Sequence, residues 1–367
     1  MFERARGTRD FGPADMGRRL AFERLCDQVA ARCGFARIAT PTFERLELFT
    51  AKSGDAIVDQ LYAFKDRSDR DLTLRPELTA PVMRMVAEQG GQMAKPARWC
   101  YYGSCFRYEE SKAGRFREFW QYGCEIIGAS GPLTEAEVVG FACSILDAAG
   151  LVDWELRVGN VGVLNDVLSG LALEGAAVGD AMRLLDKGDF DALAALGIDA
   201  AGTELLRALA GLEGGAEAIP RARDILTGMG ITTSSLDDLE QMLDALSALA
   251  PAPPSLTVDF TVARGLDYYT GMVFEIDVAE LGGEGQVCGG GSYNLLHLFG
   301  LEDLDPCCGF GLGFDRVLIA LERQVETREI LLQLVQRARA DAARRDIHDA
   351  LEGDAVSLIA REAEVGE

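Results

Sequence analysis

The chain has few of the residues that build metal centres and disulfide frameworks. Only two histidines, His297 and His348, occur among 367 residues, and the nine cysteines show no CxxC spacing. A zinc site is therefore not expected, and an odd number of scattered cysteines is typical of reduced core residues. The adjacent pair Cys307-Cys308 could be redox-active, but packing is the favoured interpretation.

Long apolar runs are also absent. No stretch approaches the length that crosses a membrane, and the N-terminal MFERARGTRDFGP has no apolar core of the signal-peptide kind. We therefore expect a cytoplasmic protein. The length fits either two domains or one large domain with an insertion.

Basic residues are scarce relative to acidic ones. Lys and Arg total 36 against 59 Asp and Glu, so the net charge is −23. Phosphate binding over a large footprint needs concentrated Lys and Arg, which argues against extensive nucleic-acid contact. The acidic excess is also consistent with a salt-rich cytoplasm or with solubility alone.

Alternating and helical patterns predict an α+β fold, in which a mostly antiparallel sheet is flanked by helices. The segments RWCYYGSCFRYEE and REFWQYGCEIIG form a predicted long hairpin, and LYAFKD and DLTLRPE a shorter one. WELRVGN is a further strand, and residues 134–150 a helix. An amphipathic helix is predicted over residues 14–34, its apolar side supplied by Met16, Leu20, Phe22, Leu25 and Val29.

Composition changes between residues 161 and 250. This stretch is rich in Ala, Leu and Gly, has 15 acidic residues against 5 basic ones, and is followed by the linker APAPPS. We predict a helical insertion over 161–250 within a discontinuous domain made of 1–160 and 251–322. Residues 323–367 are predicted to form a charged helical tail.

Four segments combine arginine with sheet or Gly-rich patterns: LRPELTAP, FRYEESKAGRFREFWQYG, ARGLDYYTG and GFGLGFDRVL. One arginine in such a setting is usually paired with a carboxylate. Four on separate strands indicate a polyanion in a cleft, because guanidinium groups suit phosphate.

These segments resemble the catalytic core of class II aminoacyl-tRNA synthetases, and specifically histidyl-tRNA synthetase of the archaeal type. GFARIATPTFE is similar to the first class motif, which lies at a dimer interface around its proline, here Pro41. FRYE…GRFREF resembles the second motif and GFGLGFDR the third, while RGLDYYTG distinguishes the histidine enzyme within its class. The resemblance runs from GTRDFGP at residue 7 to GFDRVL at residue 318.

The resemblance implies an amino-acid carboxylate attacking the α-phosphorus of ATP, with fixed positive charge stabilising the transition state. Arg107 would hold the α-phosphate, Arg264 would contact it from the opposite side, and Arg316 would hold the γ-phosphate. Phe119 would stack on adenine, and Glu109 and Arg115 would complete the ATP site. Mg²⁺ would accompany ATP and bridge its outer phosphates, with no protein ligand assigned.

A histidine pocket carries over in the same way. Glu77 and Thr79 would bind the substrate ammonium, because a carboxylate and a hydroxyl suit a cation. The ammonium and imidazole would also meet a set of polar strand residues: Gln121, Glu125, Tyr268, Tyr269 and Tyr293. Each aromatic residue alone would more often belong to a core, but their register with the arginines favours a binding role.

Three departures from the family pattern affect the expected acceptor. Too few residues follow the third motif for the family's anticodon-binding domain. Glu110-Ser111 follows FRYE where the family has Arg-Pro, and Gly290–Asn294 reads GGSYN in place of GGRYD. We therefore expect a homodimeric ligase that activates histidine or a related amino acid and passes it to a small molecule or carrier protein rather than tRNA.

Two alternatives remain open. The regulatory subunit of ATP phosphoribosyltransferase is a histidyl-synthetase-like protein that is not an enzyme by itself. The second alternative is a histidyl-tRNA synthetase that charges tRNA. The acidic net charge and Glu110 argue against this alternative.

Overall fold

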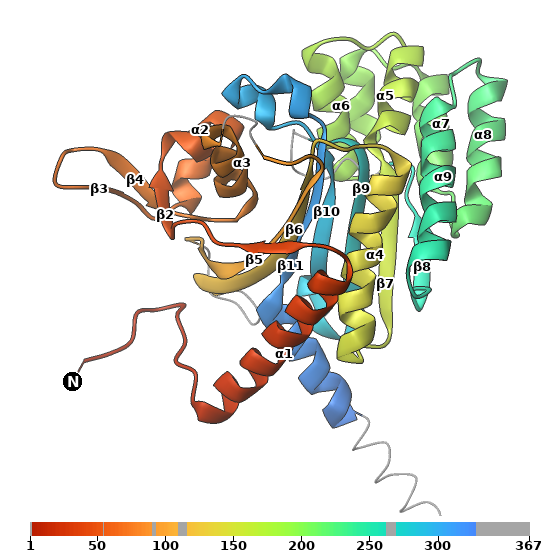
Figure 1. Cartoon of the computed structure of the whole chain (residues 1–367). Helices are drawn as coiled ribbons and strands as arrows, with labels where there is room; N and C mark the ends of the chain where they lie inside the picture. The colour runs from red at the N-terminus through yellow and green to blue at the C-terminus, as the bar shows by residue number, and fades with distance from the viewer. Residues whose placement is uncertain (1, 54, 90–92, 109–115, 262–268, 328–367) are drawn as a thin grey trace, which may run out of the picture. The chain divides into compact units, whose positions relative to one another are not determined.

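A computed structural model describes residues 2–53, 55–89, 93–108, 116–261 and 269–327, and every structural statement below refers to these residues (Figure 1). The chain divides into two units, Met1–Ala320 and Leu321–Glu367. The features that follow belong to the first unit. In the second, the described residues 321–327 are helical.

An eight-stranded sheet forms the centre of the first unit, with strand order β1-β5-β6-β11-β10-β9-β7-β8. The pairs β1–β5 and β7–β8 are parallel and the others antiparallel. This confirms the predicted α+β class. Its strands are β1 (Ala36–Ile38), β5 (Ala97–Phe106), β6 (Glu118–Ile127), β7 (Trp154–Asn160), β8 (Ser255–Val258), β9 (Tyr269–Val278), β10 (Gln286–Tyr293) and β11 (Cys307–Gly313).

Both predicted hairpins are confirmed. β5 and β6 pair over ten residues, from Ala97 opposite Ile127 to Phe106 opposite Glu118. The shorter hairpin belongs to a second sheet of order β2-β4-β3, made of β2 (Phe43–Arg45), β3 (Ala63–Lys65) and β4 (Asp71–Leu74). The long hairpin forms the second and third strands of the large sheet and carries residues on both sides of the second-motif segment.

The helices lie on the sheet and around its ends (Figure 1). They are α1 (Pro13–Arg32), α2 (Glu47–Ser53), α3 (Thr79–Glu88), α4 (Pro132–Ala149), α5 (Val161–Gly170), α6 (Ala176–Asp186), α7 (Ala200–Ala210), α8 (Ile219–Gly228) and α9 (Ser234–Leu249). Short 3₁₀ turns are η1 (Asp55–Gln60), η2 (Asp191–Leu196), η3 (Ala216–Ala218), η4 (Ala279–Glu284), η5 (Leu296–Phe299) and η6 (Glu302–Leu304). A further helix begins directly after β11 and includes residues 314–320.

One face of the sheet is covered by α1 and α4. Phe141 of α4 stacks on Phe35 with ring centroids 4.7 Å apart and meets Phe310 of β11 edge-on at 5.4 Å. Because side chains alternate along a strand, this face takes Tyr122 and Phe274, which are fully buried. One part of the hydrophobic core therefore lies between the sheet and these helices, while a second cluster packs Val82, Met83 and Val86 of α3 against the opposite side.

The predicted apolar side of the first helix is partly wrong. Met16 and Leu20 are exposed, whereas Arg19 is buried together with Phe22 and Val29. Arg19 turns inward because its guanidinium donates to Asp315 and lies 4.5 Å from the Trp120 ring centroid. A carboxylate partner from 296 residues away cannot be read from helical periodicity.

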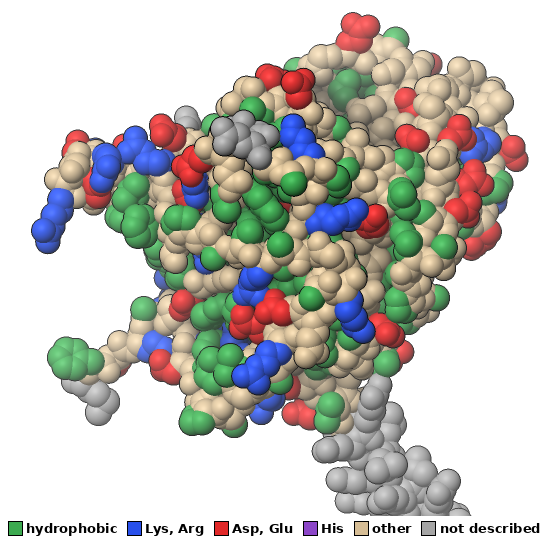
Figure 2. Space-filling view, in the orientation of Figure 1, with side chains coloured by type: hydrophobic (Ala, Val, Ile, Leu, Met, Phe, Trp, Pro, Cys, Tyr) green, Lys and Arg blue, Asp and Glu red, His purple; other side chains and the backbone are tan. Residues whose placement is uncertain are grey.

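The stretch predicted as an insertion is helical, with α5 to α9 between β7 and β8. Asn160 ends β7 and caps α5, its side-chain oxygen accepting from the Gly162 amide at 2.8 Å. Acidic side chains gather over α7 to α9 on the face seen in Figure 2. Of the helices in the described ranges, none is both long and apolar enough to cross a membrane.

Asp315, next to the third-motif arginine, joins distant segments. Its Oδ1 lies 2.8 Å from Arg9 Nη2 and accepts from Arg19 Nη1 at 2.6 Å. Its Oδ2 accepts from the Trp120 backbone amide at 2.8 Å. One carboxylate, 5% exposed, thus ties the N-terminal segment, α1 and β6 to the end of β11.

Asp315→Ala is expected to lower the free energy of unfolding by about 3–5 kcal/mol, because two guanidinium groups lose their buried carboxylate. Urea denaturation followed by circular dichroism measures this loss. Asp10→Ala is the matched control, since Asp10 pairs with Arg4 on the surface, where a pair contributes about 0–1 kcal/mol. A loss at Asp315 no larger than at Asp10 would contradict the anchoring role.

Candidate functional site

On the sheet face opposite α4, glycines leave space for larger side chains from neighbouring positions. Gly123, Gly309, Gly311 and Gly291 lie on neighbouring strands, and larger side chains extend across them. A Cβ added at Gly123 would lie 2.5 Å from the Tyr101 ring, and one at Gly309 would lie 1.8 Å from Glu125 Oε2. The absence of side chains at these positions therefore makes the room for a polar pocket.

Glu125 is the buried acidic group of this pocket and is 1% exposed. Its Oε1 accepts from the Tyr101 hydroxyl at 2.8 Å, and its Oε2 accepts from the Tyr293 hydroxyl. The side chain of Thr79 also hydrogen-bonds it. The structure thus brings together three residues that the sequence predicted for one pocket, Thr79, Glu125 and Tyr293.

Burial raises the pKa of Glu125 to about 7. Hydrogen bonds from Tyr293, Tyr101 and Thr79 oppose this rise, because they stabilise the charged carboxylate and so lower its pKa. The nearby Glu77 carboxylate raises this pKa further. A carboxyl group with a pKa near neutrality can act as an acceptor or a donor, which suits an imidazole partner.

Glu77 caps helix α3. Its Oε2 accepts from the Thr79 amide at 2.6 Å, and its Oε1 from the Ala80 amide at 3.2 Å. A carboxylate is favourable at a helix N-terminus, where backbone amides have no partner within the helix. The contact of Glu77 and Thr79 with a substrate ammonium group stays a prediction. The Glu77 carboxylate can accept further hydrogen bonds besides those from the two amides, so such a contact is chemically open to it.

Gln121 and Tyr269 lie on the same face of the sheet. Gln121 Oε1 accepts from the fully buried Cys105 thiol at 3.3 Å, and its amide lies over Gly311. Tyr269 is opposite Tyr293 in the register, and its ring lies 3.0 Å from a Cβ built at Gly291. Both positions agree with the predicted pocket, while their ligand contacts stay predictions.

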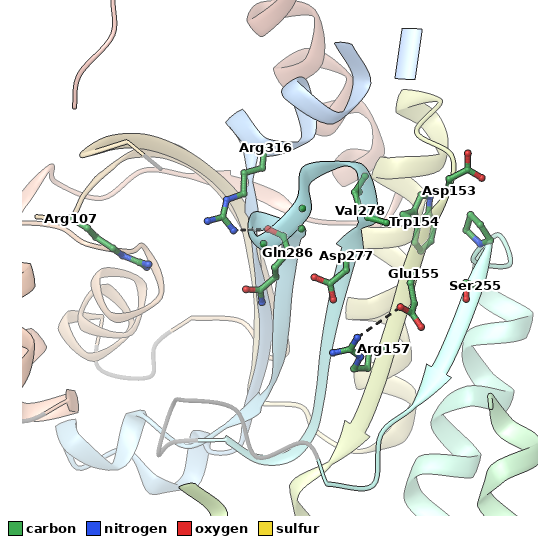
Figure 3. Close-up of a pocket in the computed structure, with 15 residues that line it drawn as sticks. Arg107, Asp153, Trp154, Glu155, Arg157, Ser255, Asp277, Val278, Gln286 and Arg316 are labelled. Atoms are coloured by element: carbon green, nitrogen blue, oxygen red, sulfur yellow. Dashed lines mark hydrogen bonds and ion pairs between the residues drawn. The ribbon is translucent and has the colours of Figure 1, made fainter. Parts of the chain in front are cut away.

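A cavity of about 980 Å³ lies along this face and is lined by Arg107, Arg157 and Arg316. In Figure 3, Arg107 approaches from the β5 side and Arg157 rises from β7, with Arg316 and Gln286 between them. Arg316 Nη1 donates to the Gln286 carbonyl at 2.7 Å, and Arg157 lies 3.9 Å from Glu155. Two of the arginines predicted to bind phosphate therefore share one cavity.

Phe119 lies beside this arginine set, half-buried on β6. The Arg107 guanidinium carbon is 5.2 Å from the Phe119 ring centroid, and Arg107 Nε donates to the Pro76 carbonyl at 3.0 Å. Acidic groups also line the cavity, at Asp153, Glu155 and Asp277. Within the described ranges, no group of three or more His, Cys, Asp or Glu residues is placed to hold a metal ion.

Arg75 corrects the interpretation of the first arginine segment. Its guanidinium donates to the backbone carbonyls of Ser104 at 2.8 Å, Thr40 at 2.7 Å and Pro41 at 3.1 Å. Gly103 makes room for it, since a Cβ there would lie 2.3 Å from Arg75 Nη2. Arg75 therefore fixes backbone geometry and does not line the arginine cavity.

Four predicted residues, Glu109, Arg115, Arg264 and Tyr268, lie outside the described residues. Tyr101, in contrast, was missed by the sequence interpretation. The hairpin register places it opposite Gly123, and its hydroxyl reaches Glu125. Alternation along β5 from Cys105 could have indicated its face, because both residues lie on the same side as Gln121 and Glu125.

The family described as Histidyl-tRNA synthetase matches residues 7–317 of the chain. The chain belongs to the histidyl-tRNA synthetase family. Its large antiparallel sheet with flanking helices is the class II synthetase fold, as predicted.

Relatives and solved structures support this membership. "Histidine--tRNA ligase" of Archaeoglobus fulgidus is 44% identical over 337 residues, which cover 90% of this chain and 78% of the relative. A Bacillus halodurans protein titled "ATP phosphoribosyltransferase regulatory subunit/histidyl-tRNA synthetase" has a TM-score of 0.77 at 27% identity, covering 91% and 90%. Apo S. aureus histidyl-tRNA synthetase has a TM-score of 0.63 at 30% identity, covering 88% and 74%.

These relatives bear on the predicted acceptor. The ligase from Archaeoglobus is named for tRNA, as is a Methanosarcina acetivorans relative that is 44% identical over 319 residues. The expectation that tRNA is not a partner of this histidyl-tRNA synthetase family member therefore finds no support among them.

Gly309→Ala is expected to lower the free energy of unfolding by about 1–3 kcal/mol, because the added methyl group would meet the Glu125 carboxylate and the Cys124 carbonyl. Thermal and urea denaturation measure the change. Gly179→Ala is the control, since a Cβ there meets nothing within 4 Å. If the two variants were equally stable, the packing of Glu125 over Gly309 would be wrong.

Glu125 also predicts a pH dependence of stability. The pKa of Glu125 rises from 4.5 to about 7 on folding. The resulting contribution to the free energy of unfolding is therefore full below pH 4.5 and is lost as the pH rises through 7. On going from pH 4.5 to about pH 8, wild type should lose about 3 kcal/mol of unfolding free energy relative to Glu125→Gln. Urea titrations across this range test the sign. A constant difference between the two proteins would contradict it.

Proposed function

We propose that this chain activates histidine with ATP, forming histidyl adenylate and pyrophosphate, and transfers the histidyl group to tRNA. The observation that carries the first step is the Glu125 pocket on the same sheet face as the Arg107 and Arg316 cavity. An acceptor for an imidazole and cations for a triphosphate thereby occur together.

Glu125 would accept a hydrogen bond from the substrate imidazole, and Tyr101 and Tyr293 would hold the carboxylate in place. An amino acid without an N–H group at that position would not make this hydrogen bond, which penalises wrong substrates. By family resemblance, Gln121, Tyr268 and Tyr269 would complete the pocket, while Glu77 and Thr79 would bind the ammonium group.

ATP would lie along the arginine cavity. Arg107 and Arg264 would contact the α-phosphate and Arg316 the γ-phosphate, with Phe119, Glu109 and Arg115 completing the nucleotide site. The lining arginines suit an anionic ligand, because planar guanidinium groups match phosphate oxygens. Mg²⁺ arriving with ATP would neutralise charge on the outer phosphates.

Relatives named histidine--tRNA ligase favour tRNA over a small molecule or a carrier protein as the acceptor. The alternative acceptors rest on sequence alone, on Glu110-Ser111 and the GGSYN segment. Dimerisation through the first motif and the division into 1–160 with 251–322, 161–250 and 323–367 also stay predictions.

A regulatory role without catalysis is the second candidate. It is supported by the likeness to the Bacillus halodurans protein, which is described as an ATP phosphoribosyltransferase regulatory subunit/histidyl-tRNA synthetase and is covered to 90%. The intact arginine set and Glu77 favour catalysis, since a histidine sensor has no need of phosphate-binding cations.

Pyrophosphate exchange separates these functions. The purified chain is incubated with ATP, labelled pyrophosphate and each amino acid in turn. Exchange that depends on histidine supports adenylate formation, whereas no exchange with any amino acid overturns it and favours the regulatory role. Acid-stable charging of added tRNA then tests the acceptor, and exchange without charging would favour a non-tRNA acceptor.

Arg107→Ala is expected to reduce histidine-dependent exchange by about 100-fold or more, because a fixed positive charge at the transition state is removed. Arg98→Ala is the control near the start of β5, the strand that ends just before Arg107, since Arg98 pairs with Glu137. Arg264→Ala should abolish exchange while the fold is retained. If either variant exchanged pyrophosphate at the wild-type rate, the assignment of that arginine to the ATP site would be wrong.

A further inference from the structure

Glu135 is a second buried carboxylate close to the pocket strands, and it comes from the opposite side of the sheet. It lies in the first turn of α4 and is 6% exposed. Its Oε1 accepts from the Ser292 hydroxyl of β10 at 2.5 Å and from the Met272 amide of β9 at 3.3 Å. One oxygen therefore joins two adjacent strands to a helix.

These contacts fall where the β9–β10 ladder is irregular. Gly291 is opposite Val273, but Tyr293 is opposite Tyr269. Between these two pairs, β10 has one residue, Ser292, whereas β9 has three, Thr270–Met272. The β9 segment therefore contains two extra residues. A bulge of this kind leaves backbone groups without their ladder partners, and the Met272 amide finds its acceptor in Glu135.

Small residues let the carboxylate reach the bulge. A Cβ at Gly271 would lie 3.1 Å from Glu135 Oε1 and 3.2 Å from the Ser292 Cβ. Ser292 itself is 3% exposed and stands where the family pattern GGRYD has arginine. A short hydroxyl side chain and a glycine are therefore fitted to this carboxylate.

Residues on both sides of the bulge belong to the pocket. Tyr269 begins β9 and is opposite Tyr293, whose hydroxyl donates to Glu125. Ser292, one residue before Tyr293, points to the other face and meets Glu135. Any shift of the bulge would therefore move the two tyrosines relative to Glu125.

We propose that Glu135 is a positioning residue for the histidine pocket, which holds the β9 bulge so that Tyr269 and Tyr293 face Glu125. This proposal rests on the proposed function, because it assigns those tyrosines to histidine binding. Glu135 acts through the Met272 amide and the Ser292 hydroxyl and does not itself touch substrate.

Three substitutions test the proposal. Glu135→Ala removes the acceptor, whereas Glu135→Gln keeps an oxygen that can accept the same two hydrogen bonds. Glu137→Ala is the matched control two residues along α4, where the side chain pairs with Arg98 of β5 instead. Each variant is first checked for a cooperative thermal transition.

In pyrophosphate exchange, Glu135→Ala should raise the KM for histidine by about tenfold, with the KM for ATP changed by no more than about twofold. Glu135→Gln should restore the KM for histidine to within about threefold of wild type. An unchanged KM for histidine, an equal rise in both KM values, or the same effect in Glu137→Ala would overturn the proposal.

A second readout is independent of catalysis. Hydrogen exchange of the Met272 amide should speed up at least about tenfold in Glu135→Ala, and stay near wild type in Glu135→Gln and Glu137→Ala. Should the wild-type protein show no histidine-dependent activity, the proposed function fails while this measurement still decides whether Glu135 holds the bulge. Equal protection in all four proteins would overturn the proposal.

Discussion

The burial of one carboxylate, Glu125, is the constraint on which the rest of the site depends. A buried acidic group is unfavourable unless donors surround it. Here two tyrosine hydroxyls and Thr79 supply them from β5, β10 and the start of α3. Because these donors come from separate segments, the pocket forms only when the β5–β6 hairpin, β10 and α3 are all in their native positions.

The supports of this pocket lie mainly outside it. Arg75 binds the Ser104 carbonyl just before the second motif and the Thr40 and Pro41 carbonyls of the first motif. Asp315 joins β6 to two N-terminal arginines. Such contacts fix the backbone from which Arg107, Gln121 and Arg316 project. They also divide the arginines into two kinds: Arg9, Arg19 and Arg75 bind protein acceptors away from the cavity, whereas Arg107 and Arg316 line it.

Much of the fold could be predicted from the sequence. Alternation in β5 and β6 and the composition change after Asn160 are local signals, and both gave elements that the structure has. Arg19 and Arg75 were missed or misread because their roles depend on partners outside their own elements, whereas Tyr101 was missed although alternation along β5 indicates its face. Asp315 is 296 residues from Arg19, and no periodicity encodes that pairing. The resemblance to the family located Glu125 and Tyr293, but not the hydroxyl of Tyr101 beside them.

The glycines of β10 and β11 have a consequence for how this site can change. Along their pocket-facing side the wall of the site is peptide backbone, which is held by ladder hydrogen bonds on both edges. Such a wall has no rotamers, so it cannot adjust its shape to a different ligand. New ligand preferences in this scaffold would have to arise at the few side chains that project across the glycines, while the surface beneath them stays the same.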